Sequence, residues 1–271
     1  MNSGLSALLV AAAEAPLVSV VVLTFNRAKL LAETVNAILG QTHRNLELIV
    51  VDNMSDDETP SYLKSIADPQ VRFLRNPNHG VLAVNRNLGI RHAHGKYVAF
   101  CDDDDIWLPT KLEQQVAALE QNSDAALCFT NMLAVRGADD PGYPVFSRSL
   151  ANRTFNALIW RNFICISSVL VRKEILERFG PLDEDPDLIP YDDYALWLRI
   201  ASHKKIIGID EPLVRYRVHP QSFGARFANR ELIVARVLAG AAHRLHRRRL
   251  AIWCSALLRC LKYLYSRLRH G

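Results

Sequence analysis

The sequence of 271 residues has few cysteines and none of the spacings that bind zinc or build a disulfide framework. Its five cysteines are an odd number, and no two of them form a CxxC pair. A small disulfide-stapled scaffold needs an even set, and a zinc knuckle needs CxxC pairs, so both classes are excluded. This cysteine usage predicts a reducing, cytoplasmic compartment.

Long hydrophobic runs are also missing. No stretch reaches the roughly 18 uncharged apolar residues of a membrane-spanning helix. The apolar segment 5–13 has no basic residue before it, so we expect no signal peptide. Hydrophobic residues make up 49% and charged residues 23% of the chain, which excludes disordered and low-complexity classes. The expected location is the cytoplasm, with a peripheral position on the inner face of the membrane as a further possibility.

Acidic residues are scarce only at the end of the sequence. Residues 226–271 carry eleven Lys and Arg against one acid, Glu231, which gives +10, whereas residues 1–225 carry 22 basic and 27 acidic residues, which gives −5. A basic arm of this kind suits either nucleic acid or an anionic membrane surface.

The pattern within this arm favours the membrane. Apolar residues recur at steps of three and four, while Arg248, Arg259 and Lys262 fall opposite them, as in a helix that lies in a lipid interface. We therefore expect contact with an anionic membrane surface and no nucleic acid partner. The alternative is a helix packed on the protein body or on a second subunit. The apolar stripe comprises Leu250, Trp253, Cys254, Leu257, Leu258, Leu261, Leu264, Tyr265 and Leu268.

Strand-like apolar runs alternate with helical patterns along the rest of the chain. This alternation predicts βαβ units and a mainly parallel sheet flanked by helices. The expected strands are 18–23, 46–51, 71–74, 97–101, 125–135, 166–171 and 205–209; the expected helices are 30–39, 81–94, 111–122, 155–161, 192–202, 229–245 and 248–269; the expected loop is 137–149.

Polar side chains follow three of these strands directly. Thr24, Asp52 and Asp102 come at strand ends. In an open α/β sheet the ligand site lies at the carboxyl ends of the strands, so these residues should meet in one crevice.

Four consecutive carboxylates, Asp102 to Asp105, form the most distinctive feature. They repel one another, and burying any of them without a counter-ion is costly. A cation resolves this, and oxygen ligands suit Mg²⁺ or Mn²⁺. The alternative is a solvated acidic turn that caps a helix starting near Pro109.

Other acids have two interpretations each. Asp52 could accept hydrogen bonds from a nucleotide base or ribose, or it could cap its strand. Asp192 and Asp193 open a predicted helix, where the helix dipole favours acids, but one of them could also serve as a general base.

Three basic or polar residues are weaker candidates. Arg86 and Asn87 could reach phosphate oxygens, although a solvated helix face also explains Arg86. His219 could be a metal ligand or a phosphate contact, although a lone histidine is more often structural.

In order and spacing, these segments resemble the family 2 inverting glycosyltransferases of the GT-A fold over roughly residues 17–220. The resemblance implies a nucleotide-diphosphate-sugar donor, a divalent Mn²⁺ or Mg²⁺, and a DxD motif whose outer members are Asp102 and Asp104. Asp192 stands where the family usually has Glu. The segments are VSVVVLTFNR (18–27), ELIVVDNMS (47–55), GVLAVNRNLGIRHAHG (80–95), FCDDDDIWLP (100–109), YDDYALWLR (191–199) and YRVH (216–219).

The resemblance also implies roles for individual residues. The nucleotide-sugar site would comprise Thr24, Asn26, Arg27, Asp52, Arg86, Asn87, Asp102 and Asp103; the metal ligands would be Asp102, Asp104 and His219; the catalytic base would be Asp193.

We therefore expect a metal-dependent inverting glycosyltransferase that uses a uridine-based donor and a glycan or lipid-linked saccharide acceptor. A sugar nucleotidyltransferase is an alternative, but 24–27 is not its Gly-rich phosphate loop. A non-catalytic binding module tethered by the tail is another. The expected fold is an α/β fold of GT-A type with a Rossmann-like sheet and an added C-terminal helical segment. Its parts are an extension (1–16), a nucleotide-binding half (17–110), an acceptor half (111–225) and a basic helical tail (226–271).

Overall fold

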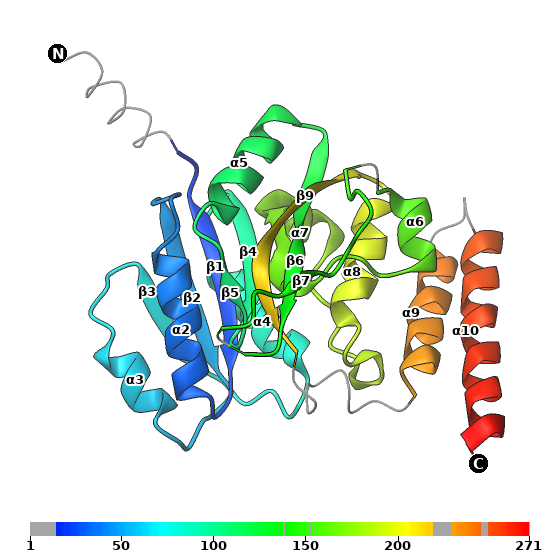
Figure 1. The fold of residues 1–271 in the computed structure, drawn as a ribbon, viewed down its shortest axis with the longest axis horizontal. Helices are drawn as coiled ribbons and strands as arrows, with labels where there is room; N and C mark the ends of the chain where they lie inside the picture. Colours follow the sequence, from blue (N-terminus) through cyan, green and yellow to red (C-terminus); the bar gives the residue numbers. More distant parts are fainter. Residues whose placement is uncertain (1–14, 138, 152, 219–228, 245–248, 271) are drawn as a thin grey trace.

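The structure, a computed structural model, contains one curled sheet with helices on both faces and two further helices at one side (Figure 1). Part of the predicted extension 1–16 and the whole of His219 lie outside the described residues. The structure describes residues 15–137, 139–151, 153–218, 229–244 and 249–270, with the backbone alone in 243–244, 249–250 and 264–270.

The sheet has the strand order β3-β2-β1-β4-β8-β6-β9-β5, with β7 paired to β6. β3, β2, β1 and β4 are mutually parallel, β6 and β9 are also parallel, and β8 joins the two groups by antiparallel pairing. The predicted mainly parallel sheet flanked by helices is confirmed. The strands are β1 (Val18–Thr24), β2 (Leu46–Asp52), β3 (Val71–Arg75), β4 (Tyr97–Asp102), β5 (Ile106–Trp107), β6 (Ala125–Val135), β7 (Tyr143–Pro144), β8 (Val169–Arg172) and β9 (Lys205–Arg217).

The continuous apolar run of β1 is explained by burial on both faces. Val20 and Val22 pack in one hydrophobic cluster with Leu31 of the following helix, whereas Val21 packs in a second cluster on the opposite face. A strand covered on both sides needs no polar alternation. The helices are α2 (Ala28–Leu39), α3 (Thr59–Ser65), α4 (Leu82–His92), α5 (Lys111–Gln121), α6 (Phe155–Trp160), α7 (Lys173–Phe179), α8 (Asp192–Ala201), α9 (Arg230–Arg244) and α10 (Arg249–His270), with 3₁₀ turns at Ile166–Ser168 and Pro186–Leu188.

Four short elements, α3, α7, β5 and β7, lie outside the expected pattern, and two expected strands have different bounds. Residues 166–168 form a 3₁₀ turn, so β8 begins only at Val169. β9 continues past the expected end at 209. Its pairing with β6 is irregular between Thr130 and Asn131, where Asp210 and Glu211 have no paired residue, and pairing resumes at Pro212. A β-irregularity of this kind lets a strand carry a polar interruption.

The register of the parallel strands brings the expected polar residues to one edge. Thr24 is paired with Asp52, and Leu23 is paired with Asp102. The three strands β2, β1 and β4 therefore end at the same level, where their loops form the candidate site.

The expected C-terminal helical segment is present and packs on the body. Leu238 of α9 and Ile252 of α10 are fully buried and share a hydrophobic cluster with Trp197 of α8. Figure 1 shows α9 beside α8 and α10 on the outside of α9. None of the described helices has the length and apolar character that crossing a bilayer requires.

We predict that Gly89→Ala destabilises the fold. A Cβ at Gly89 of α4 would lie 2.3 Å from Cγ1 of Val21 in β1, a stiff side chain in the packed core. Overpacking of this kind costs about 1–3 kcal/mol, which outweighs the roughly 1 kcal/mol that alanine gains over glycine in a helix. Chemical denaturation measures the loss.

Gly240→Ala is the matched control, because a Cβ at this position of α9 meets nothing within 4 Å. It should leave the free energy of unfolding unchanged or raise it slightly. Equal effects of the two substitutions would show that helix α4 is not in close contact with β1.

Candidate active site

The loops that follow β1 and β2 are tied together by Asn26. Its amide Nδ2 donates to Asp56 (2.6 Å), its Oδ1 accepts from the backbone N–H of Asp56 (2.9 Å), and its own N–H donates to Ser55 Oγ (2.9 Å). Asn26 has φ = 53°, a left-handed conformation that asparagine tolerates well. Asn26 therefore fixes the edge of the site through its backbone N–H and through both polar atoms of its side chain.

Asp52 is fully buried at the end of β2 and already has protein partners. Its carboxylate accepts from the backbone N–H of Ser55 (2.9 Å) and from Nε of Arg75 (2.8 Å), and Arg75 also donates to the Ser55 carbonyl (2.7 Å). These contacts hold the loop after β2 in place, as expected if Asp52 caps its strand. A nucleotide contact by Asp52 stays a prediction.

Two features make this edge suitable for contact with a nucleoside. The buried hydroxyl of Thr24 makes no hydrogen bond of good geometry, although it is close enough to Asp103 to lower the pKa of that carboxyl. Phe25 is 52% and Met54 is 49% exposed on the two adjoining loops, although both are large apolar side chains. The sequence analysis did not single out Phe25 and Met54; their only signal is an apolar residue within a polar loop.

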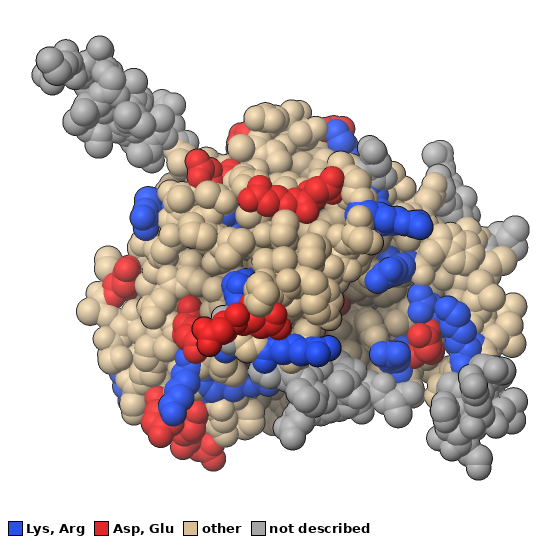
Figure 2. All heavy atoms as spheres, viewed as in Figure 1, with Lys and Arg blue, Asp and Glu red and all other residues tan. Residues whose placement is uncertain are grey.

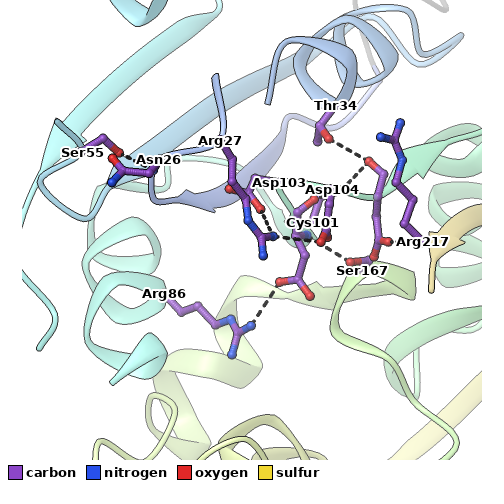
Figure 3. Close-up of polar contacts among 12 residues, drawn as sticks. Asn26, Arg27, Thr34, Ser55, Arg86, Cys101, Asp103, Asp104, Ser167 and Arg217 are labelled. Atoms are coloured by element: carbon purple, nitrogen blue, oxygen red, sulfur yellow. Dashed lines mark hydrogen bonds and ion pairs between the residues drawn. The ribbon is translucent and has the colours of Figure 1, made fainter. Parts of the chain in front are cut away.

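The acidic run turns sharply after β4, and Arg27 supplies its counter-charge (Figure 3). The Arg27 guanidinium lies 3.0 Å from Oδ1 of Asp103 and 2.9 Å from Oδ2 of Asp104. Burial raises the pKa of Asp103 to about 6, although Arg27 opposes this. Arg27 is thus the internal cation that lets these acids lie side by side.

Asp105 is the most deeply buried acid of the run, and its contacts join the turn to two other elements. Its carbonyl accepts from the Thr34 hydroxyl (2.9 Å), and its Oδ1 accepts from the backbone N–H of Arg217 (3.2 Å). Burial, and then the charge of Asp102, raises the pKa of Asp105 well above the ordinary carboxyl range. Asp105 joins the turn to α2 and β9.

A buried arginine joins the acidic run to the acid pair of α8. Arg86, which is 5% exposed, donates to Asp102 (3.2 Å) and to Asp192 (3.0 Å). Burial opposes its charge, but the two carboxylates raise the pKa of Arg86 above its ordinary value. The predicted DxD aspartate and the predicted acid pair, 90 positions apart in the sequence, therefore share one guanidinium.

Asp193 is the group best placed for proton transfer. Its side chain is largely buried, and its Oδ1 accepts from the N–H of Tyr194 (2.6 Å). Burial, and then repulsion by Asp192, raises the pKa of Asp193 to about 7. A carboxylate with a pKa near the working pH suits general base catalysis.

Asn87 does not face the crevice, so the structure does not support its predicted place in the nucleotide site. Its amide donates to the Leu182 carbonyl (2.9 Å) and to Glu184 (2.8 Å), and its Oδ1 accepts from the Leu182 N–H (2.9 Å). The side chain is 1% exposed and holds the loop before α8. Arg86 and Asn87 are neighbours on a helix and therefore point to different sides.

Ser167 is a supporting residue that the sequence analysis missed. Its hydroxyl accepts from the backbone N–H of Asp102 (3.0 Å), and its carbonyl accepts from Nε1 of Trp107 (2.9 Å). It fixes the backbone on both sides of the acidic turn. No local pattern in the sequence signals this role, because the contact joins β4 to a segment 65 positions away.

The described residues offer a partial ligand set for a divalent cation. No group of three or more His, Cys, Asp and Glu is gathered as a complete metal site in the part of the chain that the structure describes. Asp102 and Asp104, with side chains 38% and 17% exposed, are the accessible carboxylates of the run. Mg²⁺ uses one or two carboxylates and takes its other ligands from phosphates and water, so this donor set fits such an ion.

Comparison of sequences gives one matching family. The family model described as glycosyl transferase family 2 matches residues 19–180. The chain is 30% identical over 252 residues to the Escherichia coli UDP-Glc:alpha-D-GlcNAc-diphosphoundecaprenol beta-1,3-glucosyltransferase WfaP, covering 92% of this chain and 96% of that protein. It is 29% identical over 206 residues to the putative teichuronic acid biosynthesis glycosyltransferase TuaG of Bacillus subtilis, covering 75% and 79% of the two chains.

Comparison of structures confirms the expected GT-A type of fold. S. aureus TarS 1–349 in complex with UDP-GlcNAc superposes with a TM-score of 0.72 at 18% identity, over 89% of this chain and 72% of that one. The Pyrobaculum calidifontis mannosyltransferase PcManGT in complex with GDP-Man and Mn²⁺ gives a TM-score of 0.62 at 21% identity, over 94% and 76%.

We predict that Arg86→Met costs about 3–5 kcal/mol of stability, because it leaves the buried Asp192 without its counter-charge. The double variant Arg86→Met/Asp192→Leu should recover much of this loss. Arg72→Met is the control, since Arg72 is 44% exposed and its ion pair with Glu47 should contribute about 0–1 kcal/mol. Denaturant titration of the unaltered protein and these three variants measures each loss. A loss no larger than that of Arg72→Met would contradict a stabilising role for Arg86.

Proposed function

This chain belongs to glycosyl transferase family 2, and we propose that it transfers a sugar from a UDP-sugar to a hydroxyl of a lipid-linked saccharide. The observation that carries the proposal is the shared guanidinium of Arg86, which joins a donor-side acid, Asp102, to the acid pair that contains Asp193. Such a link keeps the leaving-group side and the acceptor side of one reaction at a defined separation.

A uridine-based donor is supported by the edge between β1 and β2 and by the relatives. The hydroxyl of Thr24 and the exposed side chains of Phe25 and Met54 offer one polar and two apolar surfaces to a nucleoside. TarS is described in complex with UDP-GlcNAc, and WfaP is named as a UDP-Glc transferase. We assign Asn26, Arg27 and Asp52 to the walls of this site.

A lipid-linked acceptor is supported by WfaP, whose name specifies a diphosphoundecaprenol-linked sugar. We propose that the nucleotide site is built by residues 17–110, that residues 111–225 form the acceptor side, and that residues 226–271 are a basic helical tail. A lipid-linked acceptor would bring the enzyme to a membrane surface, where it would act as a peripheral protein.

The proposed reaction is a single displacement that inverts the anomeric carbon. Asp193 would accept the proton of the acceptor hydroxyl while the bond between the sugar and the diphosphate breaks. Arg86 would hold Asp192 in position, and Asp192 would help to hold the pKa of Asp193 high enough for it to act as a base. Burial of Asp193 excludes water that would otherwise compete for this proton.

Asp102 and Asp104 would hold the divalent cation, Mn²⁺ or Mg²⁺. When bound, such an ion neutralises charge on the leaving diphosphate. Arg27 already neutralises Asp104 in this structure, so it would compete for the same carboxylate or move to the phosphates. The predicted ligand His219 lies outside the described residues.

The function is tested with the purified full chain, labelled UDP-glucose and UDP-GlcNAc, and a synthetic sugar-diphospholipid acceptor. The expected result is a new glycosidic bond of inverted configuration with release of UDP. Release of pyrophosphate from a nucleoside triphosphate would favour the nucleotidyltransferase alternative. Donor binding without turnover under any condition would favour the non-catalytic module.

Asp104→Ala should abolish turnover in Mn²⁺ and leave the protein folded, because removal of one acid from a repelling run does not weaken the fold. Turnover with and without Mn²⁺, together with the melting temperature, measures both effects. Asp124→Ala is the control, since Asp124 is an acid 69% exposed in its side chain and remote in sequence from the run. Near-normal activity of Asp104→Ala in Mn²⁺ would contradict its assignment as a ligand.

Asp193→Asn should lower kcat by about 10² or more and leave donor binding largely intact. Because the pKa of Asp193 is raised to about 7, its basic form accumulates as the pH rises through 7. The rate of the unaltered enzyme should therefore increase with pH in this range, and the variant should lose this increase.

The control for this prediction is Asp187→Asn, an exposed acid of the preceding segment. It should keep both the rate and the pH profile. A variant Asp193→Asn that loses donor affinity but keeps its turnover number would assign Asp193 to binding instead.

A further inference from the structure

Helix α10 presents an apolar face to solvent. Trp253 is 43%, Leu257 61%, Leu258 48% and Leu261 52% exposed, and together they form a stripe along about two and a half turns. These are four of the large apolar residues that the sequence analysis placed on one side of the helix. Scattered exposed leucines need no explanation, but a continuous stripe marks an interaction surface.

The orientation of α10 is set by its opposite face. Ser255 donates to the carbonyl of Ile159 (2.8 Å), and Arg259 pairs with Glu231 of α9 (2.8 Å). Residues two positions apart lie about 200° apart around a helix, so Leu257 and Leu261 point away from the side that carries Ser255 and Arg259. Ile252, Ser255 and Ala256 are buried on the side that faces the body. The apolar stripe on the opposite side therefore faces solvent.

Trp160 of α6 lies beside α10, on the side of that helix that carries Arg259. Its side chain is 48% exposed, and its carbonyl accepts from the Arg259 guanidinium (2.8 Å), which places the end of α6 against α10. Tryptophan is enriched where a protein meets the lipid headgroups, because its ring is apolar and its N–H is polar. We call Trp253, Leu257, Leu258 and Leu261 the outer face.

Charge identifies the occupant of the outer face. Residues 226–271 carry a net +10, and the exposed Lys262 follows Leu261 directly. Figure 2 shows that Lys and Arg predominate over Asp and Glu on the viewed side of α9 and α10. Two copies meeting through α10 would bring two such basic segments together, whereas an anionic lipid surface is complementary to them.

We propose that the outer face docks on the surface of an anionic lipid bilayer, with α10 lying in the plane of the interface. This inference rests on the proposed function, because a lipid-linked acceptor is confined to the membrane surface and the enzyme must reach it there. Tyr191, which precedes the acid pair of α8, is close enough to Arg230 and Arg259 for their charges to act on its pKa. The acid pair of α8 and the body side of α10 are therefore neighbours.

The test is co-sedimentation of the full chain with vesicles of phosphatidylcholine, with and without phosphatidylglycerol. The unaltered protein should bind the anionic vesicles and be released by high salt. Leu257→Ser/Leu261→Ser should weaken this binding by about tenfold or more, because both side chains lose their apolar contact with lipid. Phe73→Ser/Tyr143→Ser is the control, since it removes two exposed apolar side chains from β3 and β7 and should leave binding unchanged.

Equal binding by both double variants, or binding that ignores lipid charge and salt, would overturn the proposal. A dimer of the unaltered protein in light scattering that is lost in Leu257→Ser/Leu261→Ser, without vesicle binding, would assign the face to a second copy and also overturn it. A second assay, release of UDP from a UDP-sugar with a water-soluble acceptor, tests the proposed sugar transfer separately from bilayer docking. Turnover without vesicle binding refutes the docking alone, and vesicle binding without turnover refutes the proposed reaction alone.

Discussion

The site depends on compensation of the negative charge of the acidic run and of the acid pair of α8. Without positive partners, burial of these carboxylates would destabilise the fold. Two guanidiniums do this work: Arg27 faces the exposed end of the acidic run, and Arg86 is buried between Asp102 and Asp192. A buried ion pair adds little net stability, but losing one partner is expensive. The arrangement therefore specifies one relative position of β4 and α8 more than it strengthens the fold.

Most of the sheet could be predicted because its signals are local. A β-branched run such as Val18–Leu23 and a helical spacing such as that of α2 are each contained in a dozen residues. The missed parts depend on partners far along the chain. β9 continues beyond 209 only because β6 offers an irregular edge that accommodates Asp210 and Glu211, and no pattern within β9 shows this.

The site residues divide in the same way. Register alone brings Thr24, Asp52 and Asp102 to one edge, so their convergence could be expected from strand ends. The direction in which a side chain of a helix points could not be predicted in this way. Arg86 and Asn87 are adjacent in α4, yet one joins the acids and the other clamps the loop at Leu182. A rotation of about 100° per residue separates them, and only the packing of α4 on the sheet decides which one faces the site.

The same compensation of charge extends to the tail. The first 225 residues are net acidic and residues 226–271 are net basic, so the tail is attracted to the body that it packs on. Only part of that attraction is used internally: Arg259 pairs with Glu231, a member of the tail itself, and Arg236 pairs with Asp185 and Asp187 near α8. Most of the positive charge of the tail exceeds what these acids can neutralise. The outer face itself is apolar and has the exposed Lys262 beside it, so its contact with an anionic interface would combine burial of apolar side chains with the attraction of a net basic tail.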